Sequence, residues 1–281
     1  MMSLFPLSLK EVPAIGMGTW YMGEDPDKRS QEIKALQTGI EHGLTLIDTA
    51  EMYGDGLAEE LVGEAIKPYD RSQLALVTKV YPWNASGDKM RLSLEHSLRR
   101  LQTDYVDLYL LHWREDTPLE ETIEMFEQLK AEGKLRAWGV SNFDAADMKE
   151  LETISANCAT NQVLYNMSNR GIEFDLLPWM RERQMPLMAY TPLGHGDTLK
   201  ANFTKNPILL EIAAQHKCSV YQILLAWCIR AGDVIAVPKS GNPEHVKANA
   251  RALEIKLNDE ELNLIEAIFP RPLHKTPLEV L

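Results

Sequence analysis

The sequence predicts an α/β fold, a barrel of eight parallel strands, and three observations lead to it. Eight short apolar segments recur along the 281 residues. Helical patterns fill the intervals, and the first six segments begin roughly 25–30 residues apart, the length of one strand–helix unit. Eight such units in about 250 residues are typical of a closed barrel. We therefore expect a single domain over residues 1–281, folded as a (β/α)8 TIM barrel.

The eight segments read as strands buried on both faces, because most are continuous apolar runs rather than alternating ones. A wider gap before the eighth leaves room for an inserted loop and an extra helix. The predicted strands are 14–19, 44–47, 74–78, 105–111, 135–140, 159–163, 186–189 and 234–237.

Apolar residues three and four positions apart predict helices between the strands. The clearest stripes are Ile33, Leu36 and Ile40, stopped by Gly43; Met90, Leu94, Leu98 and Leu101; and Leu119, Ile123, Phe126 and Leu129, stopped by Gly133. Capping boxes open two later helices, Ser219 with Gln222 and Asn258 with Glu261. The segment 1–11, with Leu4, Leu7 and Leu9, is expected to cap the barrel bottom, and the tail from Pro270 to form an irregular arm.

A doubly wound dinucleotide-binding fold is the main alternative, and its glycine fingerprint is incomplete. That fold needs GxGxxG at its first strand-to-helix turn. Here Gly16 and Gly18 are followed by Tyr21 in place of the third glycine.

Composition narrows the class of protein further. The net charge is −12 and no basic stripe is present, so nucleic acid is not an expected partner. Cys158, Cys218 and Cys228 are odd in number and widely spaced, which favours reduced thiols without a metal site. The N-terminus lacks a signal-peptide pattern and no apolar run approaches the roughly 18 residues of a membrane helix. We expect a cytoplasmic protein without a membrane partner.

Polar side chains follow the predicted strands where barrel enzymes carry their chemistry, at the carboxyl ends. Strands two, three and four deliver Asp48, Lys79 and His112, and Tyr53 lies on the loop after strand two. Any one of them has a structural explanation, such as a helix cap or a packed ring. Four on neighbouring strands indicate a shared site.

These four side chains suit one kind of proton chemistry. Lys79, held charged by Asp48, is expected to lower the pKa of Tyr53, which ordinarily lies near 10. Tyr53 can then donate a proton to a carbonyl oxygen as it becomes an alkoxide, while His112 hydrogen-bonds the same oxygen. No side chain supplies a hydride, so a nicotinamide cofactor is implied.

The other strand ends fit that cofactor. Ser141, Asn142 and Gln162 are hydrogen-bonding groups suited to a carboxamide, and Tyr190 offers a ring for stacking. Beyond the last strand, Lys239 and Ser240 precede a helix that opens with Asn242 as N-cap and Pro243 at its first position. A helix N-terminus beside a lysine is an anion site, although an ordinary capped loop would look the same.

With these residues in place, the sequence resembles the aldo-keto reductases from about residue 12 to about residue 270. The bacterial methylglyoxal and diketo-sugar-acid reductases look most similar. The matching motifs are Gly16-Met17-Gly18-Thr19-Trp20, Ile47-Asp48-Thr49-Ala50 with Tyr53-Gly54, Thr78-Lys79, Leu111-His112-Trp113, Gly139-Val140-Ser141-Asn142-Phe143, Asn161-Gln162, Tyr190-Thr191-Pro192-Leu193 and Val237-Pro238-Lys239-Ser240.

The resemblance implies NADPH-dependent reduction of aldehydes and ketones by a (β/α)8 barrel. It implies a catalytic tetrad of Asp48, Tyr53, Lys79 and His112. The cofactor residues that we expect are Gly18, Thr19, Trp20, Asp48, Ser141, Asn142, Gln162, Tyr190, Thr191, Leu193, Lys239, Ser240, Gly241, His245 and Asn249.

One departure from the family pattern concerns the 2′-phosphate of NADP. Relatives usually have an arginine where this chain has His245, and often a glutamate where it has Ala248. A histidine binds phosphate well only when protonated, and its ordinary pKa is near 6.5. NADP(H) is still the expected cofactor, with a smaller preference over NAD(H).

The predicted substrate pocket is aromatic, built from Trp20, Tyr53, Trp83, His112 and Trp113, and suits small, largely apolar carbonyl compounds. Monomers or weak oligomers are expected. Two alternatives stay open: an aldolase that forms a Schiff base on Lys79, and a regulatory subunit that binds NADP without turnover.

Overall fold

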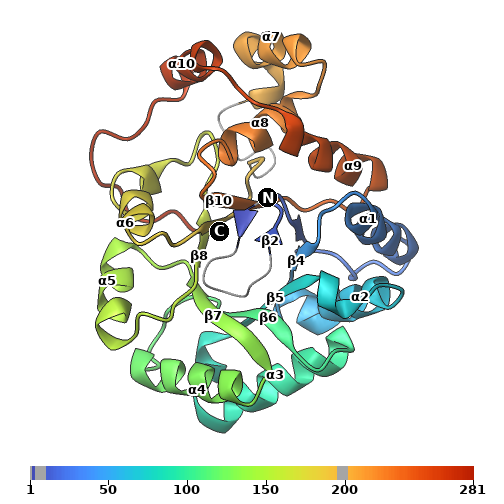
Figure 1. Ribbon diagram of the computed structural model, residues 1–281, viewed down its shortest axis with the longest axis vertical. Helices are drawn as coiled ribbons and strands as arrows, with labels where there is room; N and C mark the ends of the chain where they lie inside the picture. Colours follow the sequence, from blue (N-terminus) through green and yellow to red (C-terminus); the bar gives the residue numbers. More distant parts are fainter. Residues whose placement is uncertain (1, 4–10, 195–201) are drawn as a thin grey trace.

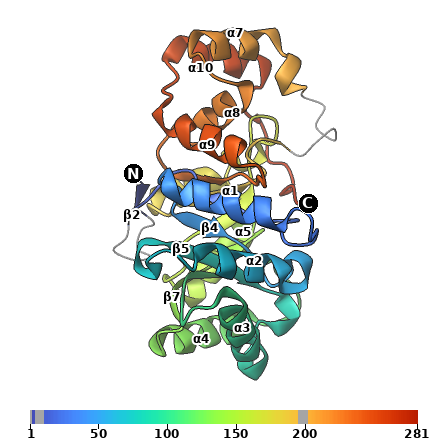
Figure 2. The ribbon, with the colours of Figure 1, turned by 90° about the vertical axis from the view of Figure 1, so that its right-hand side faces the viewer.

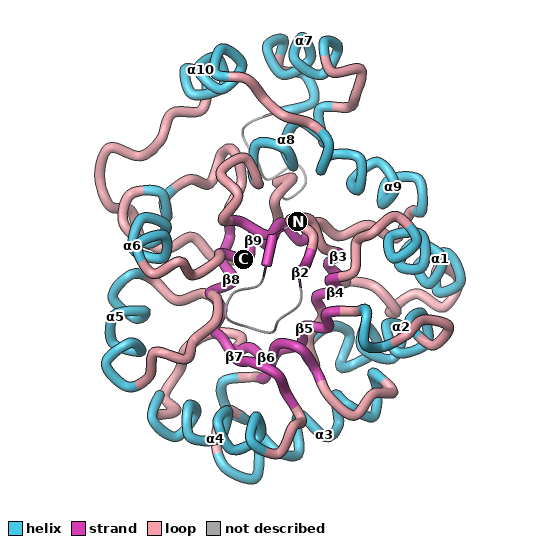
Figure 3. Tube along the Cα trace, viewed as in Figure 1, coloured by secondary structure: helices cyan, strands magenta, loops and turns pink. Residues whose placement is uncertain are grey.

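Eight parallel strands form a nearly closed ring in the computed structural model, which describes residues 2–3, 11–194 and 202–281. The hydrogen-bonded order runs from β10 back to β3, so that strands consecutive in the chain are neighbours in the sheet. Bridges between Ile15 and Ala236 and between Gly18 and Lys239 join the two edges of the sheet. Figures 1 and 3 show the resulting ring of strands. The strands are β3 (Met17–Gly18), β4 (Leu46–Asp48), β5 (Ala75–Val80), β6 (Val106–Leu111), β7 (Leu135–Ser141), β8 (Asn161–Leu164), β9 (Leu187–Tyr190) and β10 (Val234–Val237). The predicted (β/α)8 barrel is confirmed.

Helices surround this ring, as Figure 1 shows. They are α1 (Arg29–Glu41), α2 (Leu57–Ile66), α3 (Gly87–Leu101), α4 (Leu119–Ala131), α5 (Ala145–Ile154), α6 (Leu176–Glu182), α7 (Pro207–Gln215), α8 (Val220–Cys228), α9 (Pro243–Arg251) and α10 (Asp259–Ile268). Both predicted capping boxes are present, at Ser219 and Asn258. The extra helix expected before the last strand is α7.

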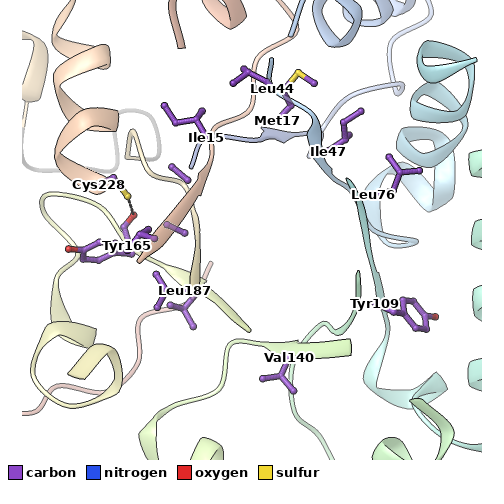
Figure 4. Packing of buried hydrophobic residues seen from close by; sticks show 14 of the residues in the cluster. Ile15, Met17, Leu44, Ile47, Leu76, Tyr109, Val140, Tyr165, Leu187 and Cys228 are labelled. Atoms are coloured by element: carbon purple, nitrogen blue, oxygen red, sulfur yellow. Dashed lines mark hydrogen bonds between the residues drawn. The ribbon is translucent and has the colours of Figure 1, made fainter. Parts of the chain in front are cut away.

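Two apolar clusters hold strands and helices together. Side chains such as Ile47, Leu76 and Val140 point outward from the strands and pack under the helices (Figure 4). A smaller cluster, including Leu46, Val77 and Leu108, fills the barrel interior. Because both faces of the strands are buried, their continuous apolar runs are explained.

Part of the N-terminal segment lies across the barrel end remote from the C-terminus (Figure 2). Strand β1 (Met2–Ser3) pairs antiparallel with β2 (Glu11–Val12). Val12 is buried and belongs to the interior cluster, in agreement with the predicted cap. The leucines on which that prediction rested, Leu4, Leu7 and Leu9, lie outside the described residues.

The observed strands differ from the predicted ones mainly at their ends. The first predicted strand, 14–19, is reduced to Met17–Gly18 with a bridge at Ile15. Other strands shift by one or two residues, and Lys79 and Ser141 fall inside β5 and β7. Residues 270–281 form no helix or strand, as expected for an irregular arm.

Candidate active site

A cavity of about 320 Å³ opens at the carboxyl ends of the strands. Eight polypeptide segments contribute to its wall, and the C-terminal tail reaches it through Leu281. The lining residues are Gly18, Thr19, Trp20, Tyr21, Asp48, Met52, Tyr53, His112, Trp113, Ser141, Asn142, Gln162, Tyr190, Thr191, Pro192, Leu193, Gly194, Val237, Pro238, Lys239 and Leu281.

Lys79 lies beneath this cavity with its side chain fully buried. Its Nζ donates to both carboxylate oxygens of Asp48, each at 2.9 Å, and to the backbone oxygen of Thr49 at 2.8 Å. A fourth contact of 3.1 Å joins Nζ to the Tyr53 hydroxyl. Strand pairing of β4 with β5 places these groups side by side. The ammonium therefore bridges a carboxylate and a phenol.

The charge of Lys79 is stabilised in this position. Burial by itself lowers the pKa of Lys79, but the Asp48 carboxylate and the Tyr53 hydroxyl outweigh it, so the pKa is raised above 10.5. Lys79 is consequently protonated at neutral pH.

The pKa of Tyr53 shifts in the direction opposite to the one expected. Burial raises it above 10, Lys79 lowers it and Asp48 raises it again, with a net rise. Lys79 lowers the pKa of Tyr53 as expected, but the net shift is upward because desolvation of a phenolate outweighs the attraction of the ammonium. Tyr53 keeps its proton at neutral pH, as a proton donor must.

His112 approaches Tyr53 edge-on, with ring centroids 5.9 Å apart. Burial, followed by the charge of Lys79, holds the pKa of His112 well below 6.5. A neutral imidazole carries one N–H donor and one acceptor. Nδ1 has no partner among the described residues. His112 also lines the cavity, so its ring can hydrogen-bond a ligand there.

Hydrogen bonds order the residues predicted to meet the nicotinamide. Gln162 Nε2 donates to Asp48 Oδ1 at 2.7 Å, so Gln162 also supports the buried ion pair. Ser141 Oγ donates to the backbone oxygen of Gln162 at 2.8 Å. The Tyr190 hydroxyl donates to Asn142 Oδ1 at 2.8 Å, and Asn142 Nδ2 donates to His112 O at 3.1 Å. Amide, hydroxyl and aromatic groups therefore share one wall.

The loop after β10 forms the predicted helix cap. Asn242 Oδ1 accepts from the backbone N–H of Glu244 at 2.9 Å, and Pro243 opens α9. Lys239 is exposed at the cavity wall. Ser240, Gly241, His245 and Asn249 do not line the cavity; His245 is exposed on α9 and Asn249 is buried.

Of the predicted aromatic wall, Trp20, Tyr53, His112 and Trp113 line the cavity. Trp83 is half exposed and does not line the cavity. Its ring stacks on Tyr81 with centroids 4.4 Å apart and contacts Trp113. Sequence reasoning missed Tyr21, Met52, Pro192, Gly194, Val237, Pro238 and Leu281. Pro192, Val237 and Pro238 stand in the family motifs, and Tyr21, Met52 and Gly194 adjoin a predicted residue or motif in the chain. Leu281 had no signal beyond its place in the tail.

The described ranges contain neither a candidate metal site nor a candidate membrane-spanning helix. No group of three histidine, cysteine or acidic side chains there is arranged to hold a metal ion. Over the same ranges, no helix has the length and apolar character needed to cross a membrane.

Comparison with known proteins identifies the family. The model of the Aldo/keto reductase family matches residues 14–269. Methylglyoxal reductase YeaE of Escherichia coli K12 is 52% identical over 271 residues, 96% of this chain and 95% of that protein. Methylglyoxal reductase DkgB of Escherichia coli O157:H7 is 32% identical over 92% of this chain and 93% of its own length.

A solved structure supports the same family assignment. An aldo/keto reductase from Klebsiella pneumoniae, crystallised with NADP and acetate, matches with a TM-score of 0.94 at 52% identity, over 96% of each chain. This chain belongs to the aldo/keto reductase family and is an oxidoreductase.

Proposed function

We propose that this protein reduces small aldehydes and ketones of the methylglyoxal type with NADPH. The observation that carries the proposal is the Lys79 ammonium, fully buried, with Asp48 on one side and the Tyr53 hydroxyl 3.1 Å away on the other. The names of the two methylglyoxal reductases support the substrate class. The Klebsiella structures, solved with NADP and with NADPH, support the cofactor.

The chain's own residues fit such a cofactor. Gln162, Asn142 and Ser141 present amide and hydroxyl groups beside the ring of Tyr190, which suits a carboxamide on a flat ring. When bound, the nicotinamide supplies a hydride to the carbonyl carbon. Lys239 and the positive end of the α9 dipole offer positive charge for phosphate.

Proton transfer is the part of the reaction that the side chains perform. A carbonyl oxygen in the cavity gains negative charge as its carbon is reduced, and the Tyr53 hydroxyl donates the proton. Lys79 then stabilises the phenolate that remains, because its charge is held by Asp48. Neutral His112 donates a hydrogen bond that orients the substrate oxygen.

The two alternatives fit the site less well. An aldolase lysine must lose its proton to attack a carbonyl, whereas the raised pKa of Lys79 keeps this one protonated. A subunit that only binds NADP has no need of a proton donor paired with a buried ammonium.

The first prediction compares the wild type with Tyr53→Phe. NADPH consumption at 340 nm with methylglyoxal should fall by at least about 100-fold in the variant, because general acid catalysis contributes that much or more, while NADPH binding survives. Tyr221→Phe, at an exposed position on α8, is the matched control and should keep wild-type activity. Wild type that binds NADPH tightly but turns over no aldehyde in a wider panel would favour the binding subunit.

A second prediction concerns the choice between NADPH and NADH. The preference for NADPH is expected to be small, because His245 stands where relatives usually have an arginine, and His245→Arg should increase it, since a guanidinium is always charged and binds phosphate bidentately. The ratio of kcat/KM for the two cofactors measures the preference. An unchanged ratio in His245→Arg would contradict the prediction.

A further inference from the structure

Glu51 is a partly buried carboxylate between Asp48 and Tyr53, and the proton-transfer steps above do not use it. Its Oε1 accepts from the backbone N–H of Tyr81 at 2.8 Å and is 3.5 Å from Asn84 Nδ2. Its own backbone N–H points to Lys79 O at 3.5 Å. The contacts with Tyr81 and Lys79 join the loop after β4 to the end of β5.

These contacts link the two chain segments whose separation matters for proton transfer. Tyr53 lies two residues after Glu51, and Tyr81 lies two residues after Lys79. The side chain of Glu51 therefore spans from the tyrosine-bearing turn to the lysine-bearing strand. A shift of that turn would change the 3.1 Å contact between the Tyr53 hydroxyl and Lys79 Nζ.

The far end of the turn is held independently. Gly54, Asp55 and Gly56 all have positive φ, and a Cβ on Gly56 would lie 2.5 Å from the Arg100 side chain. Arg100 is in turn bound to buried Glu59 at the start of α2, at 2.7 Å. Loss of the Glu51 contacts would thus free the near end of the turn and leave its attachment to α2.

We propose that Glu51 is a positioning residue, which fixes the Tyr53 hydroxyl over Lys79 by holding the turn 51–53 to the end of β5. The inference rests on the proposed function, since it assigns Glu51 a part in proton donation by Tyr53. Hydrogen-bond acceptance, rather than charge, is the property that matters, because the partner at 2.8 Å is a backbone N–H.

The environment of Glu51 indicates that its charge does not stabilise the folded protein at neutral pH. A positioning role can therefore be distinguished from a contribution to stability. Burial raises the pKa of Glu51, and the hydrogen bonds from Tyr81, Ser93 and Asn84 do not offset it. A raised carboxyl pKa stabilises the folded state only at low pH, and that contribution is lost as the pH rises through the folded pKa. At pH 7, Glu51→Gln should therefore be at least as stable as the wild type.

The test measures Glu51→Ala and Glu51→Gln beside Asp55→Asn. Asp55 is an exposed acid on the same turn whose side chain makes no hydrogen bond or ion pair with the described residues, so its variant controls for charge. Misplacement of a reacting group by 1 Å can cost about 100-fold in rate. Glu51→Ala should lose roughly 10- to 100-fold in kcat, with KM for methylglyoxal and the Kd of NADPH unchanged. Its solvent deuterium isotope effect on kcat should increase, because proton transfer becomes more rate-limiting.

Glu51→Gln keeps an acceptor oxygen and should recover most of kcat. Wild-type kcat in Glu51→Ala would overturn the proposal. So would equal losses in the alanine and glutamine variants, or a loss in Glu51→Ala matched by a fall in Tm and in NADPH affinity. The wild-type and Tyr53→Phe rates, measured in the same assay, report separately on the proposed function.

Discussion

At the residue scale, the cost of burying a charge governs the site. Lys79 has no exposure and Asp48 has almost none, and the charge of Lys79 relies on its pairing with Asp48. Removing one partner from a buried pair leaves an unpaired charge, which is far more costly than losing a surface contact. The pair that we propose to prepare Tyr53 for proton transfer is therefore also a condition for folding around a buried lysine.

Asp48→Asn tests this dependence. We expect the free energy of unfolding at pH 7 to fall by about 3–5 kcal/mol and kcat to fall with it, because Lys79 loses its counter-charge. Urea unfolding and steady-state kinetics measure the two effects. Asp25→Asn, which removes an exposed 2.8 Å ion pair with Lys28, is the control and should leave both nearly unchanged.

The pH dependence of this loss follows from the raised pKa of Lys79. The stabilisation from charged Lys79 is complete below its unfolded pKa of 10.5 and is lost only as the pH rises through the higher folded value. In Asp48→Asn the burial of Lys79 is no longer offset, so the pKa of Lys79 should fall and the variant should regain part of its stability as the pH rises toward 10.5. The difference between the wild type and Asp48→Asn should therefore be larger at pH 6 than at pH 9, and a difference that grows over this range would contradict the assignment.

At the element scale, two helices begin in the same way but near different surroundings. Asn206 caps α7 and is followed by Pro207, as Asn242 caps α9 and is followed by Pro243. Figure 1 places α7 at the periphery, whereas the loop before α9 continues from the cavity wall at Lys239. The dipole of a helix stabilises a bound phosphate only if the phosphate lies close to the N-terminus of that helix.

Asn242→Ala and Asn206→Ala form a matched pair of variants. Each should lower the free energy of unfolding by about 1 kcal/mol, the usual value of an N-cap. Only Asn242→Ala should also weaken NADPH binding, which fluorescence or calorimetric titration would detect. An equal Kd for both variants would show that the start of α9 does not contact the cofactor.

At the scale of the whole molecule, the tail after α10 returns to the mouth of the barrel. Lys275 Nζ lies 3.2 Å from Asp175 Oδ2, and Asn169 Nδ2 donates to Glu279 Oε1 at 2.9 Å, so the loop after β8 holds the arm. Leu281 then lines the cavity beside residues from strands far away in sequence. The tail completes a wall that the barrel leaves open.

Two leucines of the tail allow this contribution to be measured. Leu281→Ala should change kcat/KM across a panel of aldehydes and leave the Kd of NADPH unaltered, whereas Leu273→Ala, at a position 90% exposed, should change neither. Deletion of residues 271–281 should have a larger effect in the same direction. Unchanged kinetics across the panel in the deletion variant would exclude the tail from the substrate site.

Much of the fold could be predicted because its signals are local. Continuous apolar runs mark strands covered on both faces, and Ser219 and Asn258 start helices through contacts within four residues. The ends of the strands could not be predicted as closely, because a strand ends where its hydrogen bonds to the neighbouring strand end. The first strand is short because β4 pairs only with Met17 and Gly18.

The sequence by itself determined the barrel, the family and the set of side chains at the strand ends, because a parallel barrel brings every carboxyl end to one rim. Only the tertiary structure decided how those side chains interact. The net pKa shift of Tyr53, the contact of Gln162 with Asp48 and the span of Glu51 to Tyr81 depend on burial and on distances between segments remote in the chain. Desolvation and hydrogen-bond geometry act across such distances, and they become defined only once the ring of strands has closed.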